Sequence, residues 1–454
     1  MSGPSTIQQT LEKPRPVTLS EAFWYWLKLG FISFGGPAGQ IAIMHRDLVE
    51  QKRWISEKRF LHALNYCMVL PGPEAQQLAT YIGWLMHRTW GGLIAGGLFV
   101  LPATVILMLL TWIYLVWGQV PAVAGVLYGI KPAVTAIVLF AAYRIGSRAL
   151  KHPALYGIAA LSFVAIALLD VPFPAIILGA ALLGMLGGKF APQIFNGGGH
   201  GAAKTSYGPA LIDDDTPPPA HAAFSWGRFV AYLGAGVLIG GVTAWGIAAL
   251  FPAKSAAVLN DMSLFFTKSA LLTFGGAYAV LPYVAKAAVE HFGWLTAAQM
   301  IDGLALGETT PGPLILIVTF VGFVGAWTKG IFGGEALLLA GISGGLVATF
   351  FTFLPSFIFI FAGAPYIEST RDNLKLAAPL TAISAAVVGV IVNLALFFAT
   401  HVFFPKGVGQ PPDWVSVAIG VAAFVALFKF NLGMIKLIGA CAALGLALRL
   451  GGVV

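Results

Sequence analysis

Charged side chains are scarce in this sequence. Asp, Glu, Lys and Arg make up 10% of its 454 residues, whereas hydrophobic residues make up 58%. A typical soluble domain carries about 25% charged residues. Stretches with almost no charge, such as residues 90–118, exceed the roughly 20 residues with which an α-helix spans a bilayer. The sequence therefore predicts an all-α polytopic membrane protein with the lipid bilayer as its surroundings.

The residues and motifs of several other protein classes are also missing. The two cysteines, Cys67 and Cys441, lie far apart, and the eight histidines show no metal-ligand spacing, which argues against a disulfide framework and a metal site. The sequence has no Walker A motif and no Rossmann glycine pattern. Its basic residues are dispersed in loops. We therefore expect no cofactor, no nucleic-acid partner, no enzymatic activity and no ATP-driven transport by this chain alone.

An internal repeat stands out once the chain is compared with itself. At an offset of 240 residues, residues 28–73 match residues 268–313 without a gap, with eleven identities in 46 positions. The shared elements include a lysine, a Phe-Gly-Gly and a Pro-Gly-Pro motif in register. Such self-similarity indicates a duplicated structural unit.

The repeat divides the chain into five parts. A polar linker rich in glycine and proline separates the two copies, and an apolar helix without a counterpart follows it. The predicted parts are a cytoplasmic N-terminal segment (1–20), the first repeat (21–188), the linker loop (189–225, flexible over 197–223), a connecting transmembrane helix (226–257) and the second repeat (258–454).

The charges of corresponding loops have opposite bias. Lysine and arginine in short loops mark the cytoplasmic side, and residues 45–59 carry five of them, whereas the matching loop keeps only Lys286. The bias reverses at residues 368–375, whose first-half equivalent near Val120 is almost uncharged. We therefore expect two inverted repeats, an arrangement typical of secondary transporters, with the N-terminus in the cytoplasm.

The two motifs should break the helices that contain them. Pro71 and Pro73 cannot lie in an unbroken helix, and each arm on either side has about 12 residues, or roughly 18 Å at 1.5 Å per residue. That length is about half the hydrocarbon thickness. Re-entrant hairpins are the preferred interpretation, and kinked helices that cross the membrane are the alternative.

A helix that restarts inside the membrane points its N–H groups and positive dipole end at a cavity. Such a site suits an anion, although a kink that only permits close helix packing remains the alternative. The symmetric glycines and nearby polar side chains are therefore candidates for anion binding. They are Ser33, Gly35, Gly36, Gly72, Gln76, Gln77, Thr273, Gly275, Gly276, Thr309, Thr310 and Gly312.

Two lysines and two glutamates are the charged candidates. Lys28 and Lys268 precede the Phe-Gly-Gly motifs at equal spacing, and an ammonium group in an apolar segment usually faces a cavity, unless it reaches the interface. Glu74 and Glu308 lie next to the Pro-Gly-Pro motifs, where a carboxylate suits proton coupling or pairs with a neighbouring lysine.

Two further pairs have helical spacing. Arg46 and Glu50, like Lys286 and Glu290, are four residues apart, which favours an ion pair within one helix. An entrance for anions or a coupling pair is the alternative role.

With these residues assembled, the sequence resembles the chromate transporter (CHR) family in its long, two-domain form. The resemblance is carried by "KLGFISFGGPAGQIAIM" from Lys28, "YCMVLPGPEAQQLATYIGW" from Tyr66, "TFGGAYAVLPYV" from Thr273 and "GETTPGPLILIVTFVGF" from Gly307. It extends over essentially the whole chain. Ala277 stands where the first repeat has Pro37, so the two tips need not share substrate contacts equally.

This resemblance implies an inner-membrane carrier that exports chromate, is driven by the proton-motive force and confers chromate resistance. Sulfate, a divalent tetrahedral oxyanion of similar shape, would be a competitor or an alternative substrate. A passive anion channel is the alternative from another class. Protons are the expected coupling ion, and a homodimer is left open.

Overall fold

The computed structural model describes residues 12–34, 36–195, 207–369 and 377–454. In these ranges the chain is helical almost throughout, and the one β-bridge joins Ile55 to Ile212. Six helices are long and apolar enough to cross a membrane. They are α4 (Glu74–Trp117), α5 (Pro121–Ala149), α7 (Phe173–Phe190), α9 (Trp226–Leu250), α14 (Leu337–Ser369) and α15 (Ala377–Phe403). The prediction of an all-α polytopic membrane protein is confirmed.

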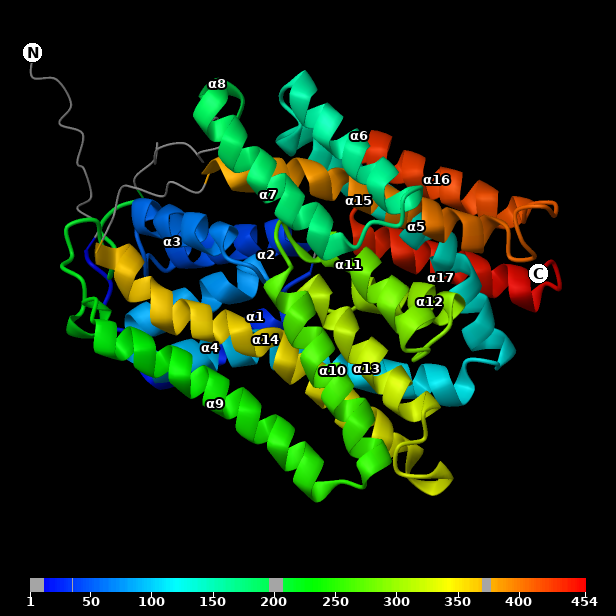
Figure 1. The fold of residues 1–454 in the computed structure, drawn as a ribbon, viewed down its shortest axis with the longest axis horizontal. Helices are drawn as coiled ribbons and strands as arrows, with labels where there is room; N and C mark the ends of the chain where they lie inside the picture. Colours follow the sequence, from blue (N-terminus) through cyan, green and yellow to red (C-terminus); the bar gives the residue numbers. More distant parts are fainter. Residues whose placement is uncertain (1–11, 35, 196–206, 370–376) are drawn as a thin grey trace, which may run out of the picture.

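Shorter helices complete each half (Figure 1). In the first half they are α1 (Leu19–Ile32), α2 (Gly36–His45), α3 (Glu57–Val69), α6 (Pro153–Ala167) and α8 (Pro192–Phe195). In the second half they are α10 (Ala253–Leu271), α11 (Ala277–Lys286), α12 (Ala297–Thr309), α13 (Ile317–Thr328), α16 (Trp414–Phe430) and α17 (Met434–Leu450). The π-helical turns Arg46–Gln51 and Ala287–His291 continue α2 and α11. The two halves thus repeat one succession of helices.

The helices are broken at all four predicted places. The Phe-Gly-Gly motifs separate α1 from α2 and α10 from α11, and the Pro-Gly-Pro motifs separate α3 from α4 and α12 from α13. Gly72 and Gly312 adopt φ angles of +125° and +94°, a region in which glycine carries no steric penalty. The prediction of broken helices at these motifs is confirmed.

The first repeat turns back soon after its Pro-Gly-Pro motif. Non-helical backbone angles at His87 and the next residue divide α4 into two arms. The arms pack closely, because a Cβ atom added to Gly83 would lie 2.4 Å from the Gly91 carbonyl oxygen. Gly322 and Gly344 make an equivalent contact between α13 and α14. Small residues permit this close approach of helices within a membrane.

The beginning of α1, the loop before α3 and the turn within α4 lie at one end of the molecule. Tyr25 of α1 packs against the ring of Trp54 in the loop before α3, with ring centroids 5.1 Å apart. The backbone N–H of Ile212 in the linker donates to the Trp54 carbonyl at 3.0 Å, and the His221 ring bonds to the Trp84 carbonyl at 2.9 Å. Since α1, the loop before α3 and the turn within α4 share one end, these contacts favour re-entrant hairpins over crossing helices.

Part of the linker is held against the first repeat. Residues 196–206 lie outside the described ranges, whereas residues 207–225 follow the surface formed by the loop before α3 and the turn of α4. Burial lowers the pKa of His221 in this segment. The described part of the loop predicted over 197–223 therefore contacts the first repeat.

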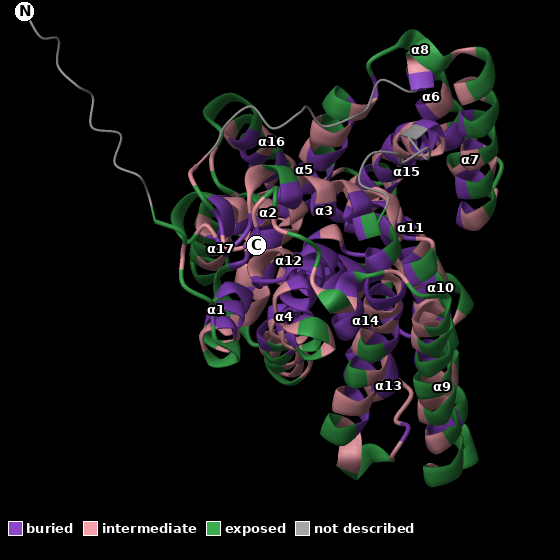
Figure 2. Ribbon diagram, turned by 90° about the vertical axis from the view of Figure 1, so that its left-hand side faces the viewer, coloured by how far each residue is buried: buried purple, intermediate pink, exposed green. Residues whose placement is uncertain are grey.

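α9 carries the chain to the opposite end. It has 25 residues, or about 38 Å of helix, and its surface is largely exposed (Figure 2). At its far end Phe251 stacks on Phe332 with centroids 5.2 Å apart, and Ser255 at the start of α10 donates to the Ile331 carbonyl. The second repeat thus begins at the end opposite to α1, and the predicted inversion is confirmed.

One long helix of each repeat packs against two helices of the other repeat. α5 packs against α16 and α17, while its counterpart α15 packs against α6 and α7. Gly129 lies against the Cys441 backbone and Gly389 against the Ala159 backbone. The two repeats therefore form one body rather than two side-by-side domains.

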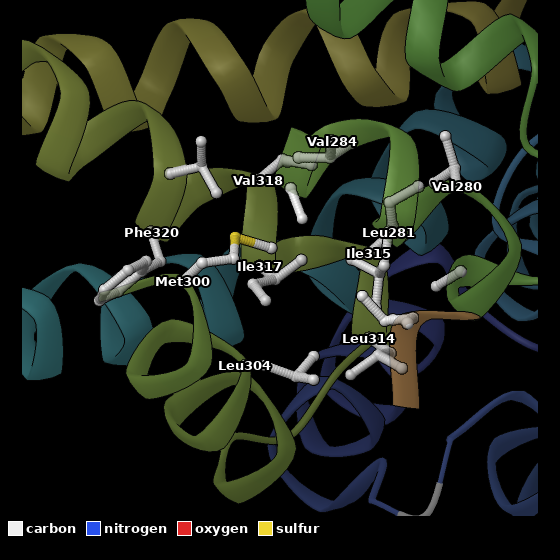
Figure 3. Close-up of a cluster of buried hydrophobic side chains, with 14 of the residues drawn as sticks. Val280, Leu281, Val284, Met300, Leu304, Leu314, Ile315, Ile317, Val318 and Phe320 are labelled. Carbon is white, nitrogen blue, oxygen red and sulfur yellow. The ribbon is translucent and has the colours of Figure 1, made fainter. Parts of the chain in front are cut away.

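A buried apolar cluster holds the broken helices of the second repeat (Figure 3). It interlocks α11, α12 and the segment that follows the second Pro-Gly-Pro motif. Its members include Val280, Leu281, Val284, Met300, Leu304, Leu314, Ile315, Ile317, Val318 and Phe320. This packing fixes the position of both half-helices relative to each other.

Candidate functional site

A cavity of about 590 Å³ lies between the two repeats. Its walls come from α2, α3, α5 and the start of α4 in one half, and from the tip before α11 and the end of α12 in the other. The charged and polar lining residues are His45, Glu50, Glu57, Glu74, Arg144, Arg148, Tyr278 and Glu308. The cavity is within the usual size range for small-ligand sites.

Two helix N-termini from different repeats reach this cavity. Gly36 begins α2, and Gly276 is the N-cap of α11; both line the cavity. Gly275 and Gly276 have φ angles of +76° and +96° with no atom within 4 Å of an added Cβ. The first N–H groups of a helix have no partner within it, so the site has backbone donors and two positive dipole ends. Gly35 lies outside the described residues.

One backbone hydrogen bond joins each Pro-Gly-Pro tip to the other repeat. The Gly72 N–H donates to the Thr273 carbonyl at 2.7 Å, and the Gly312 N–H donates to the Ser33 carbonyl at 2.7 Å. These pairs are related by the 240-residue offset in both partners. The Pro-Gly-Pro glycines therefore connect the two repeats, and the cavity lining does not include them.

Both predicted carboxylates line the cavity. Glu74 begins α4, and its side chain makes no hydrogen bond or ion pair with another described residue. Glu308 accepts a hydrogen bond from the Tyr278 hydroxyl. The two acids thus face one space from opposite repeats with different partners.

The sequence reasoning missed the cations of this site. Arg144 and Arg148 lie on α5 and line the cavity, and neither forms an ion pair within the described part of the chain. One signal was present: counting from the shared Thr-Ala-Ile motif, Val390 occupies the position of Arg144 in the second repeat.

A histidine between two carboxylates was also missed. The His45 Nδ1 lies 3.0 Å from a Glu50 oxygen, and Nε2 contacts Glu57. All three residues line the end of the cavity next to the loop before α3. This cluster places two carboxylates, and the imidazole that bridges them, at one end of the cavity.

Six predicted polar ligands use their own donors within the chain. The Ser33 and Thr273 hydroxyls donate to carbonyls four residues earlier, at 2.6 and 2.7 Å. The other four donate to neighbouring helix atoms or to the Pro71 carbonyl. None of the six lines the cavity: Ser33, Thr273, Gln76, Gln77, Thr309 and Thr310.

The structure does not bring the two predicted lysines into the cavity. Lys28 is exposed on α1, and Lys268 is exposed on α10. Lys268 lines a separate cavity of about 780 Å³ beside α7 and α11, together with Lys286 and Glu290. The symmetric lysines therefore lie on the flanks of the molecule.

The predicted ion pairs within one helix are wrong. Arg46 pairs with Asp47 at 2.9 Å, and Glu50 pairs with His45. Lys286 pairs with Asp170 at 2.6 Å rather than with Glu290. Both segments form π-helical turns, in which residues five apart are neighbours, so the four-residue spacing no longer brings the charges together.

Comparison with known proteins identifies the family. The sequence model of the family described as "Chromate transporter" matches residues 20–185 and again residues 260–446. This chain belongs to the chromate transporter family. Two relatives named "Chromate transport protein" are 32% identical in Pseudomonas aeruginosa (92% of this chain, 88% of the relative) and 27% identical in Cupriavidus metallidurans (84% and 83%).

A third relative, "Probable chromate transport protein" from Synechococcus elongatus, is 28% identical over 91% of both chains. No solved structure matches this chain. Members of the chromate transporter family act on an oxyanion, so the relevant property of the cavity is whether its groups stabilise a negative charge. Backbone N–H groups, helix dipoles and two arginines without an ion pair among the described residues all favour an anion there.

Proposed function

We propose that this protein is a secondary active transporter that exports chromate across the inner membrane, is driven by the proton-motive force and confers chromate resistance. One observation carries the proposal. The N-termini of α2 and α11 converge from inverted repeats on a single cavity that also contains Arg144. Inverted repeats around one midplane site are the architecture of alternating access.

The cavity chemistry supports a divalent tetrahedral oxyanion as the substrate. Backbone donors at the two tips approach from different directions, and an arginine forms paired hydrogen bonds with an oxyanion. No described feature of this cavity distinguishes chromate from sulfate by size or charge. Sulfate is therefore the alternative substrate, and a passive anion channel is the alternative mechanism.

The distribution of basic residues supports loading from the cytoplasm. Arg53, Arg148 and the loop before α3 lie at the end of the molecule that the positive-inside rule assigns to the cytoplasm. His45 and Arg148 line the cavity at this end. In this proposed orientation the N-terminus is cytoplasmic, and the anion enters the cavity from the end at which His45 and Arg148 lie.

Glu74 and Glu308 are the proposed proton carriers. A carboxylate in a cavity that accepts a dianion repels it unless the carboxylate is protonated or paired. Glu74 has no described partner, and Glu308 has only a tyrosine hydroxyl. Proton binding to these acids would therefore be linked to the charge of the substrate in the same space.

The test is transport by purified protein in liposomes. We expect labelled chromate to accumulate inside liposomes with an acidic lumen, because luminal protons leave as chromate enters. A protonophore should abolish accumulation, and excess sulfate should reveal whether it competes. Chromate conductance without accumulation would support a channel and contradict the proposal.

The acids are tested in the same assay with conservative variants. Glu74→Gln and Glu308→Gln should lose proton-driven accumulation while retaining exchange of chromate for chromate. Glu335, an exposed carboxylate in the loop before α14, provides the matched control, and Glu335→Gln should behave as wild type. Full pH-driven accumulation by the double variant Glu74→Gln, Glu308→Gln would exclude both acids from coupling.

A further inference from the structure

A second, polar cavity lies at the other end of the molecule. It has a volume of about 370 Å³ and is lined by the end of α4, the beginning of α5, α12 and α17. α12 and α17 lie toward the end of the long axis opposite to α3 (Figure 1). Its polar lining residues are Tyr114, Gln119, Tyr128, Lys131, Gln299, Asp302 and Arg449. We call it the outer cavity, after the orientation proposed above.

A partly buried ion pair forms part of the wall of the outer cavity. Lys131 Nζ of α5 lies 3.1 Å from Asp302 Oδ1 of α12, and the Tyr114 hydroxyl of α4 donates to Oδ2 at 3.0 Å. The Asp302 side chain is 5% exposed, whereas the Lys131 side chain is 30% exposed. The pair thus joins the two repeats where solvent reaches the lysine.

The outer cavity and the cavity of about 590 Å³ between the repeats, which we call the central cavity, lie along the same two helices. On α12, Asp302 lines the outer cavity and Glu308 lines the central one; six residues of helix separate them by about 9 Å. On α5, Lys131 lines the outer cavity and Phe140 the central one. Fully buried Ala305 lies between the two levels on α12. The contact surface between α5 and α12 therefore extends from the outer cavity to the central cavity.

We propose that the outer cavity is the external end of the translocation path and that the Lys131–Asp302 pair is its proton-operated gate. The inference rests on the proposed transport function. While the pair is intact, the carboxylate neutralises the ammonium, which cannot attract an anion. A proton from the external solution that binds Asp302 Oδ1 releases Lys131, which becomes a ligand for the departing oxyanion. Return of the proton to that solution restores the pair.

Other charged groups around Asp302 fit this role. Arg449 of α17 lines the same cavity and adds a second cation for an oxyanion. Tyr114 stays a donor to the acid, while Tyr128 of α5 donates to Asp413. α13 and the 3-10 turn before it, which also pack on α12, carry no ionisable side chain. Lys131 is therefore the cation that the state of Asp302 controls.

The test uses a thiol placed below the gate. Ala305→Cys, in full-length protein with Cys67→Ala and Cys441→Ala, is treated with a membrane-impermeant maleimide from the outside. Because the maleimide reacts with the thiolate, each rate is divided by that of an exposed cysteine labelled at the same pH. On this scale we expect slow labelling at neutral external pH and at least tenfold faster labelling at acidic pH. Adding Asp302→Asn should give fast labelling at every pH, and the same variant should leak chromate without a proton gradient.

The control variants separate gating from damage to the fold. Asp413→Asn removes another carboxylate that accepts a tyrosine hydroxyl at this end of the molecule, and it should leave labelling at the wild-type rate. Asp302→Glu, which keeps the charge, should retain the pH dependence. Labelling that ignores both external pH and Asp302→Asn would overturn the gate. Wild-type liposomes without any oxyanion transport would instead overturn the proposed function, whatever the labelling shows.

Discussion

The two repeats approach the central cavity with the same backbone and with different side chains. Each supplies one helix N-terminus, and each donates one hydrogen bond to the other through Gly72 or Gly312. Only the first repeat supplies Arg144, and only the second supplies the Tyr278–Glu308 pair. Duplication thus explains the scaffold, whereas the chemistry of the site lies where the repeats differ.

The largest expected effect concerns the ion pairs that anchor α3 and α12. Arg59 of α3 and Glu368 of α14 pair at 3.2 Å, with side chains 6% and 2% exposed, whereas Lys131, the partner of α12, is 30% exposed. Arg59→Met would leave a buried carboxylate without its cation, which costs about 3–5 kcal/mol. Lys131→Met should cost less, because water reaches this pair. The free energy of unfolding in detergent measures both.

Two controls sharpen this first comparison. Arg46 pairs with Asp47 on the surface, and such exposed pairs contribute about 0–1 kcal/mol, so Arg46→Ala should leave the free energy of unfolding nearly unchanged. Arg59→Met combined with Glu368→Gln should recover part of the loss. Equal losses for Arg59→Met and Lys131→Met would contradict the difference in burial between the two anchors.

The sequence predicted the scaffold well because its signals are local. Proline and glycine break a helix wherever they occur, so Pro71, Gly72 and Pro73 located a break without knowledge of the fold. The loop charges likewise indicated the inversion. These features depend on neighbours within a few residues, which a single sequence contains.

The side chains of the cavity depend on the rotation of helices around their axes, which the sequence does not contain. Lys28 and Lys268 share a position in the repeat, yet their helices point them outward. Arg144 lies on a helix far along the chain from both motifs and faces the cavity. The internal repeat therefore indicated the backbone features that both repeats have in common. It did not indicate the side chains that only one repeat contributes to the cavity.

The second expected effect concerns the positive charge that only the first repeat contributes to the cavity. Arg144→Gln removes a positive charge that Val390 does not replace from the other repeat. We expect chromate uptake at subsaturating concentration to fall at least tenfold, which corresponds to about 1.4 kcal/mol. Arg144→Lys should retain part of the activity, because it keeps the charge and loses the planar donor geometry.

Arg148 provides the matched comparison, since it lines the same cavity and is more exposed than Arg144. Arg148→Gln should reduce uptake less than Arg144→Gln, because solvent screens an exposed charge more strongly. Unfolding curves that match wild type would show that neither variant acts through the fold. If Arg144→Gln transported at the wild-type rate, the cavity cation would have no part in binding.

The smallest expected effect concerns Lys28 and Lys268, the most symmetric charged residues of the chain. Neither lines the central cavity, and both are exposed on the flanks of their helices. The double variant Lys28→Ala, Lys268→Ala should therefore change chromate uptake less than threefold. A tenfold loss would mean that the lysines reach the anion in another state of the transport cycle. A loss confined to Lys268→Ala would instead implicate the separate cavity beside α7 and α11, which Lys268 lines. Either loss would extend the asymmetry of the repeats beyond the central cavity.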